Sequence, residues 1–499
     1  PTRGLPGYVG YQVILDYKRR EADRNVCLLF CISLLTFLYF YSTMVYMIFE
    51  TIKNQVRNHG SKTAIVCKDK QYTYSELIES VEKLAAVLST AVRPGDSILF
   101  ASEKEYHYIR MVLACDILGV TFMPTFPNLP TDVVDNIVKA SSPDHIVMCE
   151  EDALALEPHD KALVYVTKPD HTYTVLFTSG TTGEPKAVAH TGAGCLLACL
   201  NNVNVYGMTS QDVILSQLPP STVGGLYLFA LPGLIKGCTV VIEQFNPRRF
   251  PSLCEEHKPT IGIIVPAMIL AMEKLRTWKS LDMSHWRELS VGSTVIPEEM
   301  LDILFDKGVP TIRDLYGCTE THVPPFTFLI KPDTEHKLQL ECNDQYEYKL
   351  DRHDQLWLKS PLLMKHYLNS DEELDSEGYW CTGDVFERKH NKLFYKSRKK
   401  DLIKINSHNV SPIAIENSIL VIDGVDEVCV ITQDRGLGEK YIVAIISTQD
   451  TEINKSLVMN SIKGKLMPYE FPKDIIVTDE TLPRNKMGKI QRHVVQRIY

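Results

Sequence analysis

One loop constrains the fold of this chain more than any other segment. Residues 178–186 read TSGTTGEPK and directly follow the β-branched and aromatic run Tyr173–Phe177, which predicts a buried strand. Glycines let neighbouring backbone N–H groups converge on an anion, the hydroxyls add donors, and Lys186 adds a positive charge. The segment therefore predicts a strand that leads into a polyphosphate-binding loop.

This loop differs from the Gly-x-x-x-x-Gly-Lys-Ser/Thr phosphate loop, because no Gly-Lys-Ser or Gly-Lys-Thr step is present. For the segment taken alone, a flexible Ser/Thr/Gly surface loop is the simpler alternative. The residues that we expect to surround phosphate are Thr178, Ser179, Gly180, Thr181, Thr182, Gly183 and Lys186.

Short apolar runs alternate with amphipathic stretches from residue 60 to about 330, which is the pattern of α/β layers. The strand-like runs include Ser97–Ala101, Val120–Pro124, Thr239–Ile242 and Thr260–Val265. The expected helices include Ser75–Ala91, Ala267–Arg276 and Pro297–Lys307. We therefore expect an α/β fold with a large domain over residues 51–397.

A smaller unit follows the charged stretch Ser397–Asp401. Strand-like runs at Leu356–Lys359 and Leu393–Lys396 precede this stretch, and runs at Val428–Ile431 and Tyr441–Ile446 follow it. We expect residues 398–499 to form a separate carboxy-terminal domain.

Composition excludes several classes of protein. The net charge is −9 and the pI is about 6.0, so no basic surface argues for nucleic acid as a partner. The 13 cysteines show neither a CxxC pair nor a His/Cys cluster at zinc spacing, which favours free thiols in a reducing compartment. A chain of 499 residues that is 44% hydrophobic can fill more than one domain core.

The amino-terminal extension, residues 1–50, contains a long apolar run. Residues 27–49 carry no charged side chain, and 23 residues are enough to cross a bilayer as a helix. Basic residues flank the run on both sides, so charge does not fix its orientation. We expect an intracellular protein that residues 27–49 anchor as a single span, with the carboxy-terminal part in the cytosol; the alternative is that the first 50 residues do not belong to the mature protein.

Further motifs follow the loop in order. They are Tyr316–Glu320 (YGCTE), Trp380–Asp384 (WCTGD), Ser397–Lys404 (SRKKDLIK) and Leu482–Ile490 (LPRNKMGKI). With the loop, this ordered set resembles the adenylate-forming superfamily of acyl- and aryl-CoA synthetases, firefly luciferases and peptide-synthetase adenylation domains. The resemblance covers about residues 50–499 and is strongest to acyl-CoA synthetases and 4-coumarate–CoA ligases.

The resemblance implies a fold and a reaction. The fold is a large α/β domain of several subdomains with a smaller, mobile α+β cap domain. The reaction joins a carboxylic acid to the α-phosphate of ATP and then passes the acyl group to coenzyme A, giving acyl-CoA, AMP and pyrophosphate. Two anions meet in the first step, so the site must supply cations and aimed N–H donors. ATP and CoA are the expected substrates and Mg²⁺ the expected cofactor.

The resemblance also assigns roles to single residues. Glu320 is expected to hold Mg²⁺ beside the phosphate contact Thr319, although a solvated loop acid is the alternative. For Arg398 the alternative is a surface ion pair with Asp401. The residues expected to contact the nucleotide are Gly292, Ser293, Thr294, Tyr316, Gly317, Asp384 and Arg398.

Catalysis of the first step is assigned to Lys489, together with Lys186 and Thr319. By resemblance, the cap carries Lys489 to a place between the acyl carboxylate and the α-phosphate, and then rotates about Lys400. Outside that context, the basic segment around Lys489 is typical of a solvated loop.

The stretch Leu218–Leu226 aligns with the segment that forms the acid pocket in the family. Residues Leu218–Leu231 include no acidic residue to anchor an α-amino group, and their apolar side chains favour a fatty or aryl acid. We expect contacts from Thr222, Gly225 and Tyr227, although Tyr227 could equally fill a hydrophobic core.

Some positions depart from the family pattern. Relatives carry glycine at the positions of Ser407 and Ala187, and the segment Phe328–Asp351 looks shortened. A Cβ at Ser407 narrows the expected pantetheine tunnel, so CoA transfer is less secure than adenylation. The alternatives are an adenylating enzyme with another acceptor, either a carrier-protein thiol or oxygen, and a catalytically weakened, membrane-tethered lipid-binding relative.

Overall fold

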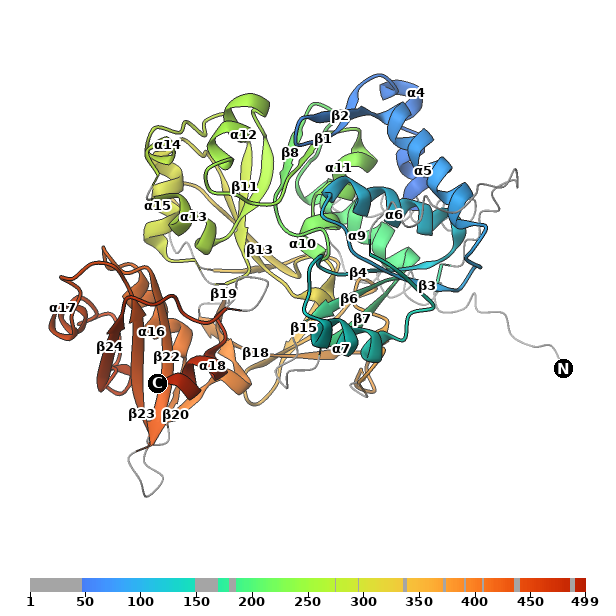
Figure 1. The fold of residues 1–499 in the computed structure, drawn as a ribbon. Helices are drawn as coiled ribbons and strands as arrows, with labels where there is room; N and C mark the ends of the chain where they lie inside the picture. Colours follow the sequence, from blue (N-terminus) through green and yellow to red (C-terminus); the bar gives the residue numbers. More distant parts are fainter. Residues whose placement is uncertain are drawn as a thin grey trace, which may run out of the picture. The chain divides into compact units, whose positions relative to one another are not determined.

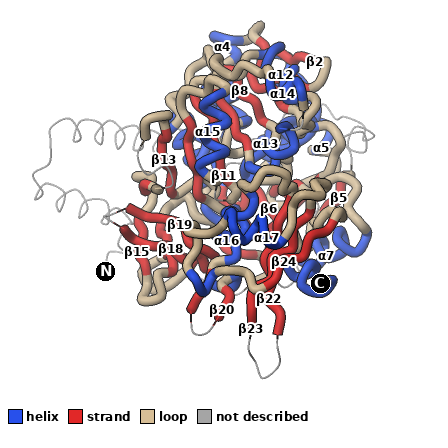
Figure 2. Tube along the Cα trace, turned by 90° about the vertical axis from the view of Figure 1, so that its left-hand side faces the viewer, coloured by secondary structure: helices blue, strands red, loops and turns tan. Residues whose placement is uncertain are grey.

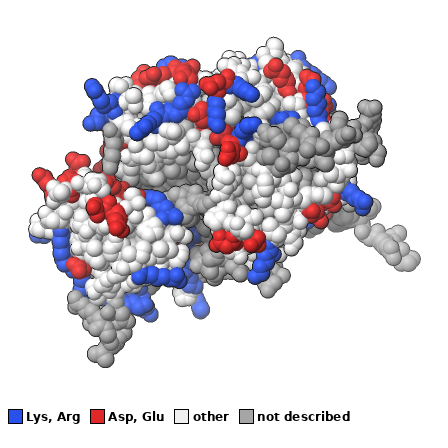
Figure 3. Space-filling model, in the orientation of Figure 1, with Lys and Arg blue, Asp and Glu red and all other residues white. Residues whose placement is uncertain are grey.

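The computed structural model describes residues 47–148, 169–178, 185–273, 275–294, 296–334, 339–370, 374–389, 392–405, 408–434, 440–484 and 490–499. These residues form mixed α/β layers, as the sequence predicts (Figure 1). On the face drawn in Figure 3, acidic and basic side chains are interspersed.

The largest sheet has a parallel centre and antiparallel edges. Strands β1, β9, β8, β10, β11 and β12 run parallel, whereas β2, β13 and β14 pair antiparallel. In sheet order the strands are β14 (Glu341–Cys342), β13 (Phe326–Ile330), β12 (Ile312–Tyr316), β11 (Glu288–Gly292), β10 (Ile261–Ile264), β8 (Val213–Ser216), β9 (Thr239–Ile242), β1 (Thr63–Cys67) and β2 (Lys70–Thr73).

A second sheet carries the strand before the phosphate loop. β5, β3, β4 and β6 are parallel, and β7 and β17 continue the sheet antiparallel. Its strands in order are β17 (His366–Tyr367), β7 (Lys186–Thr191), β6 (Thr172–Thr178), β4 (Thr121–Pro124), β3 (Ser97–Phe100) and β5 (His145–Val147).

Helices fill the space between these two sheets. α6 contacts β1 of the first sheet and β4 of the second, while α9 packs on β6 and β7 and on α11, which itself covers β8 and β9. A helix covered on both sides has no polar face, and nearly every residue of α6 is buried. α13 and α15 pack with β11 in a separate apolar cluster (Figures 1 and 2).

The helices of the described chain have the following bounds. The α-helices are α3 (Ile48–Lys53), α4 (Val56–His59), α5 (Tyr74–Leu88), α6 (Glu105–Leu118), α7 (Thr131–Ser141), α9 (Gly192–Val205), α10 (Val223–Leu226), α11 (Ala230–Lys236), α12 (Phe250–His257), α13 (Pro266–Glu273), α14 (Arg276–Lys279), α15 (Glu298–Asp306), α16 (Pro412–Leu420), α17 (Lys455–Ser461) and α18 (Arg492–Ile498). The 3₁₀ helices are η1 (Thr319–Thr321), η2 (Lys399–Asp401) and η3 (Pro468–Glu470).

A smaller antiparallel sheet and two carboxy-terminal sheets complete the described fold. The antiparallel sheet is formed by β15 (Glu347–Leu350), β16 (Gln355–Lys359), β18 (Trp380–Lys389) and β19 (Lys392–Arg398). The carboxy-terminal strands are β20 (Ile403–Ile405), β21 (His408–Val410), β22 (Glu427–Asp434), β23 (Lys440–Ser447) and β24 (Asp474–Thr478).

Residues after 402 have their own sheets and their own clusters of buried apolar side chains. The domain boundary expected near residue 398 stays a prediction, and so does the mobility of residues 398–499.

Several local predictions agree with the described elements, and the differences have local causes. Thr73 caps α5 in a reciprocal box with Glu76, which explains why that helix begins at Tyr74. The helix expected over residues 267–276 is described as far as Glu273, and Leu275 is the extended N-cap residue of α14, which begins at Arg276. Pro297 is the N-cap residue of α15 rather than a residue of its first turn.

The apolar run at residues 27–49 ends inside the α/β unit. Met47, Ile48 and Phe49 are at most 1% exposed, and α3 packs on α6 and α11. The backbone N–H of Phe49 donates to Asp116 at 2.8 Å. Residues 27–46 lie outside the described residues. Within the described ranges, no helix has the length and apolarity needed to span a bilayer.

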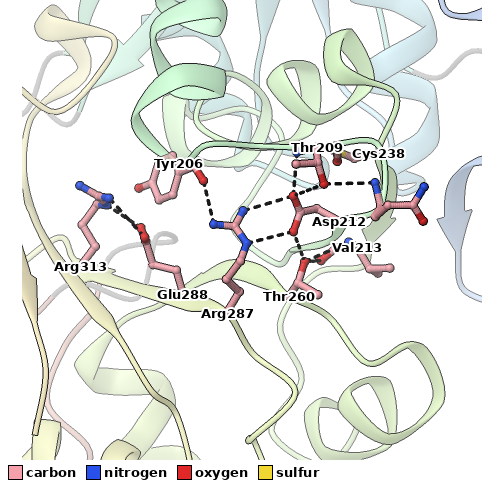
Figure 4. A network of polar contacts seen from close by, with 10 residues as sticks. Tyr206, Thr209, Asp212, Val213, Cys238, Thr260, Arg287, Glu288 and Arg313 are labelled. Carbon is pink, nitrogen blue, oxygen red and sulfur yellow. Dashed lines mark hydrogen bonds and ion pairs between the residues drawn. The ribbon is translucent and has the colours of Figure 1, made fainter. Parts of the chain in front are cut away.

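Ion pairs join the central strands of the largest sheet at their amino ends (Figure 4). Arg287 donates from Nε and Nη2 to the two oxygens of Asp212, each at 3.2 Å. Thr260 donates to the same carboxylate at 2.8 Å. Arg313 donates from Nε to Glu288 at 2.5 Å. Because these residues lie at or near the first residues of β8, β10, β11 and β12, they stabilise the sheet at the amino ends of these strands.

The carboxylate of Asp212 stays charged at this edge. Burial alone raises its pKa, but hydrogen bonds from Arg287, Thr209 and Thr260 hold the pKa below its usual range. The charged side chains at the amino ends of these strands therefore have their hydrogen-bond partners within the protein. In sheets of this kind, ligands bind at the carboxyl ends of the strands.

We predict that Arg313→Met lowers the free energy of unfolding by about 3–5 kcal/mol, because it leaves Glu288 buried without its cation. The two side chains are only 8% and 9% exposed. The measurement is urea denaturation, with Lys83→Met as control; its exposed pair with Glu79 should contribute about 0–1 kcal/mol. The double variant Arg313→Met/Glu288→Met should be more stable than Arg313→Met. Equal stability would contradict this account.

Candidate active site

Several of the residues expected to contact the nucleotide lie at the carboxyl ends of the central strands. Gly292 ends β11 and Tyr316 ends β12, and these two strands are parallel neighbours. A Cβ on Gly292 would lie 2.9 Å from the carbonyl oxygen of Leu315, so the close approach of the strands requires glycine. Ser293 and Thr294 follow and are exposed, with Ser293 at φ +74°.

An ion pair between Asp384 and Arg398 lies beside Tyr316. Asp384 in β18 and Arg398 in β19 are direct cross-strand partners. Arg398 Nε donates to Asp384 Oδ1 at 3.1 Å, and the Tyr316 hydroxyl donates to Oδ2 at 2.6 Å. Arg398 therefore forms its ion pair with the buried cross-strand residue Asp384, which corrects the alternative of a surface pair with Asp401.

The exposure of this pair is asymmetric. The Asp384 side chain is 5% exposed, whereas that of Arg398 is 39% exposed. Burial raises the pKa of Asp384 above its usual value, and the nearby charge of Glu320 adds to this, while Arg398 and Tyr316 lower it. Both carboxylate oxygens already accept one hydrogen bond, so ribose hydroxyls would use their remaining lone pairs.

The loop lysine and the expected metal ligand share one neighbour, Tyr367. The Tyr367 hydroxyl donates to Glu320 Oε1 at 2.8 Å. Lys186 Nζ lies 4.6 Å from the centroid of the Tyr367 ring. Lys186 begins β7, directly opposite Thr178 at the end of β6, so the two ends of the phosphate loop are joined. Glu320 is buried in η1 and is not a solvated loop acid.

Buried histidines support the turn that carries Glu320. The pKa of His190 is lowered by burial to about 4, so the ring is neutral, and its Nε2–H donates to the carbonyl of Thr319 at 2.9 Å. His322 follows the turn at φ +62° and ψ −47°, where Val323 N–H donates to Thr321 O at 2.6 Å. This is a γ-turn of the strained, positive-φ kind, which persists only when its surroundings impose it.

The residue expected to be the hinge, Lys400, lies close to the same group of charges. Lys400 is in η2, and its pKa is lowered by burial and then by the charges of Arg398 and Lys186. Lys186, Glu320, Asp384 and Arg398 are thus linked by direct contacts, a shared neighbour or mutual electrostatic influence. Ser179, Gly180, Thr181, Thr182, Gly183 and Lys489 lie outside the described residues.

Gly317 lies between the aromatic residue and the acidic turn. A Cβ there would meet Pro324 Cα at 3.2 Å, a tight contact. Thr319 is half-buried and opens η1 beside Glu320, and its contact with phosphate stays a prediction. The Tyr316 ring packs edge-on against Phe386, with ring centroids 4.9 Å apart. Adenine stacking on Tyr316 stays a prediction.

The residues expected to bind the substrate acid make capping and packing contacts within the protein in this structure. Thr222 caps α10, and a Cβ on Gly225 would lie 2.1 Å from the carbonyl oxygen of Pro219. The buried ring of Tyr227 packs edge-on against His322 at a centroid distance of 4.6 Å. Each residue thus has a structural role, and contact with the acid stays a prediction for all three.

Two hollows lie outside the group of charges. A cavity of about 200 Å³ is bounded by Ser102, Tyr108, Phe126, Pro219 and Ser221, next to the expected acid segment. A hollow of about 550 Å³ beside α14 and α15 contains no candidate site residue.

Glu320 fits a metal ion that is bound by one protein carboxylate and by oxygen atoms of a substrate. Among the described residues, no group of three or more His, Cys, Asp or Glu side chains could hold a metal ion. Mg²⁺ keeps several waters and binds through one or two carboxylates plus phosphates, so Glu320 alone suffices on the protein side.

Sequence reasoning did not identify Tyr367, His190 or His322. None of them lies in a motif, and each contributes through contacts between distant segments. A strained position such as His322 leaves no local signal, because histidine is not a residue that favours positive φ on its own.

Comparisons with known proteins support a single family. An indoleacetate–CoA ligase from Aromatoleum aromaticum is 25% identical over 501 residues, covering 90% of this chain and 97% of the relative. A long-chain-fatty-acid–CoA ligase, FadD13 of Mycobacterium tuberculosis strain H37Rv, is 28% identical over 342 residues, covering 65% of this chain and 67% of the relative.

Solved structures share the fold. ATP-bound MatB from Rhodopseudomonas palustris has a TM-score of 0.80 at 21% identity, covering 91% of this chain and 99% of that one. The o-succinylbenzoate CoA synthetase MenE of Bacillus subtilis, in complex with its acyl-adenylate intermediate, has a TM-score of 0.81 at 22% identity, covering 89% and 97%. Residues 52–168 and 155–343 match the family described as AMP-binding enzyme. Since this match spans more than half of the chain, the protein belongs to the AMP-binding enzyme family, within the adenylate-forming superfamily that its motifs resemble.

Proposed function

We propose that the protein is an ATP-dependent acid–CoA ligase, which forms an acyl-adenylate from a carboxylic acid and then an acyl-CoA, with AMP and pyrophosphate as products. The observation that carries the proposal is the convergence of Lys186, Glu320, Asp384 and Arg398 in one place, in a chain of the AMP-binding enzyme family. These residues supply the charges that acid activation by a nucleotide needs.

Each described residue has a part in holding the nucleotide. Asp384 would accept from the ribose hydroxyls, and the half-exposed Arg398 would reach ribose or phosphate with its remaining N–H groups. Glu320 would hold Mg²⁺, which when bound neutralises charge on the phosphate oxygens. Thr319, directly before it, would donate to a phosphate oxygen.

The first step brings the substrate carboxylate to the α-phosphate, and two lysines offset the repulsion. Lys186 would turn from Tyr367 toward the β- and γ-phosphates together with the loop residues. Lys489 would place its charge between the carboxylate and the α-phosphate and stabilise the pentacoordinate phosphorus. A positive charge fixed at that point lowers the barrier most, because negative charge accumulates there in the transition state.

The acid is proposed to be aryl or fatty. Relatives are named for indoleacetate, ferulate, 2-succinylbenzoate and long-chain fatty acids, all of which have large apolar parts. The cavity beside Pro219 and Ser221 adjoins the segment expected to bind the acid.

Coenzyme A is the proposed acceptor of the acyl group. The cap would rotate about Lys400, withdraw Lys489 and open a path for the thiol. Ser407, whose Cβ is expected to narrow this path, lies outside the described residues. A carrier-protein thiol or oxygen as acceptor is the alternative that the next experiment separates.

The test is a screen for pyrophosphate release across aryl and fatty acids of varied length, with and without CoA. The proposal expects acid-dependent release and formation of the matching acyl-CoA. Release that needs an acid but yields no thioester would favour another acceptor. If no acid gives release, the protein is not a ligase, and the lipid-binding alternative stands.

We expect Asp384→Asn to weaken AMP binding by about 10- to 100-fold, because hydrogen bonds to a charged acceptor are each worth about 1.5–3 kcal/mol. Isothermal titration with AMP measures this. The control is Asp135→Asn, at an exposed position of α7. Unchanged affinity in the Asp384 variant would remove this residue from the nucleotide site.

Lys489→Ala is expected to lower acid-dependent ATP–pyrophosphate exchange by at least ~10²-fold, the scale of losing one transition-state stabiliser. Lys486→Ala, in the same segment, is the matched control and should keep nearly full exchange. Exchange within threefold of the wild type in the Lys489 variant would rule out this role.

Membrane association is a separate proposal for residues 27–46. This run of 20 uncharged residues still has the length of a single span after Met47–Phe49 are assigned to the α/β unit. The chain should then sediment with membranes and resist carbonate extraction, while a variant lacking residues 1–46 should stay in the supernatant. Recovery of the full chain in the supernatant without detergent would contradict the anchor.

A further inference from the structure

Tyr367 lies where the phosphate loop and the metal-binding turn come together. It is 4% exposed and belongs to β17, where it pairs with Val188 of β7. Its hydroxyl contacts Glu320 and its ring face contacts Lys186. One side chain thus contacts two residues that are 134 positions apart in the sequence (320 minus 186).

The backbone around Tyr367 is fixed from both sides. Met364 N–H donates to the carbonyl of Glu320 at 2.7 Å. Lys365 N–H donates to the carbonyl of Ala189 at 2.7 Å, and the amide of Asn369 bonds to Ala187 and Pro185. A side chain on such a backbone can orient its partners, because its own position varies little.

We propose that Tyr367 is a positioning residue that orients Glu320 for Mg²⁺ and holds Lys186 away from the phosphates until ATP binds. The inference deepens the proposed function and rests on it. The phenol occupies one lone pair of the carboxylate and fixes its rotation, so the others face a metal ion.

The contact between Lys186 and the ring differs from an ion pair. A cation–π contact is weak, and a polyphosphate attracts an ammonium group more strongly than an aromatic face does. Lys186 therefore exchanges the ring for phosphate on ATP binding. AMP lacks β- and γ-phosphates, so it leaves Lys186 on the ring.

The chain contains a matched arrangement outside the site. The hydroxyl of Tyr379 donates to the exposed Glu347 at 3.2 Å, and Lys349 Nζ lies 4.2 Å from its ring centroid. Substitutions at Tyr379 remove the same chemistry from the small antiparallel sheet. They serve as controls for general effects of losing a tyrosine.

The experiment compares Tyr367→Phe, which removes the hydroxyl only, with Tyr367→Leu, which removes the ring as well. The first readout is the affinity for Mn²⁺, measured by electron paramagnetic resonance with a non-hydrolysable ATP analogue. The second is the ratio of the Kd for AMP to the Kd for that analogue without metal, which isolates the effect of Lys186. Neither readout needs turnover.

Both variants should lose about tenfold in Mn²⁺ affinity, the scale of losing a partner that orients a metal ligand. Only Tyr367→Leu should raise the AMP-to-analogue ratio, by about two- to fivefold, because it frees Lys186 from a cation–π contact. In a Lys186→Ala background that increase should vanish. Tyr379→Phe and Tyr379→Leu should match the wild type in both readouts, and unchanged AMP affinity shows that the variants are folded.

Wild-type Mn²⁺ affinity in Tyr367→Phe would overturn the role toward Glu320, and an unchanged ratio in Tyr367→Leu would overturn the role toward Lys186. Either result leaves the ligase proposal intact. A wild-type protein that binds neither nucleotide would overturn the inference and the proposed function together.

Discussion

The buried carboxylate of Asp384 is the point on which the site depends. A carboxylate that is 5% exposed needs a cation and donors, and it finds them in Arg398 and Tyr316. These contacts join β18 to β19 and join the small antiparallel sheet to the end of β12. The same contacts hold Arg398 directly before η2, the expected hinge. A single charge thus fixes the position of several elements.

The two ends of the central strands in the largest sheet differ in how exposed their charged side chains are. At the amino edge, Arg313 and Glu288 are both nearly inaccessible and satisfy each other, so they have little left for a ligand. Near the carboxyl end of β12, Arg398 of the small antiparallel sheet pairs with Asp384 and is 39% exposed, so its side chain is accessible to solvent. Because all central strands are parallel, their carboxyl ends meet at one edge, where glycines such as Gly292 let a backbone approach closely.

Much of the site could be predicted, because some of its chemistry lies in contiguous segments. The strand before Thr178, the acidic turn at Glu320 and the pair of Asp384 and Arg398 each stand in a motif. Tyr367 and His190 could not be found in this way. Each contacts a residue more than 40 positions away, and such contacts leave no pattern in the local sequence. The close approach of Gly225 to the carbonyl of Pro219 is another contact that the sequence does not show, and contact of Gly225 with the acid stays a prediction.

By itself, the sequence determined the layer type, the order of the elements and the family, because periodicity, caps and short motifs act over a few residues. It also predicted that a phosphate loop follows the strand that became β6, which ends at Thr178. Only the tertiary structure decided that Arg398 pairs with Asp384, that Lys186 rests on Tyr367, and that Met47–Phe49 are core residues. These contacts depend on which strands pair and on which helices are covered on both sides. Burial then decides which charged side chains need partners.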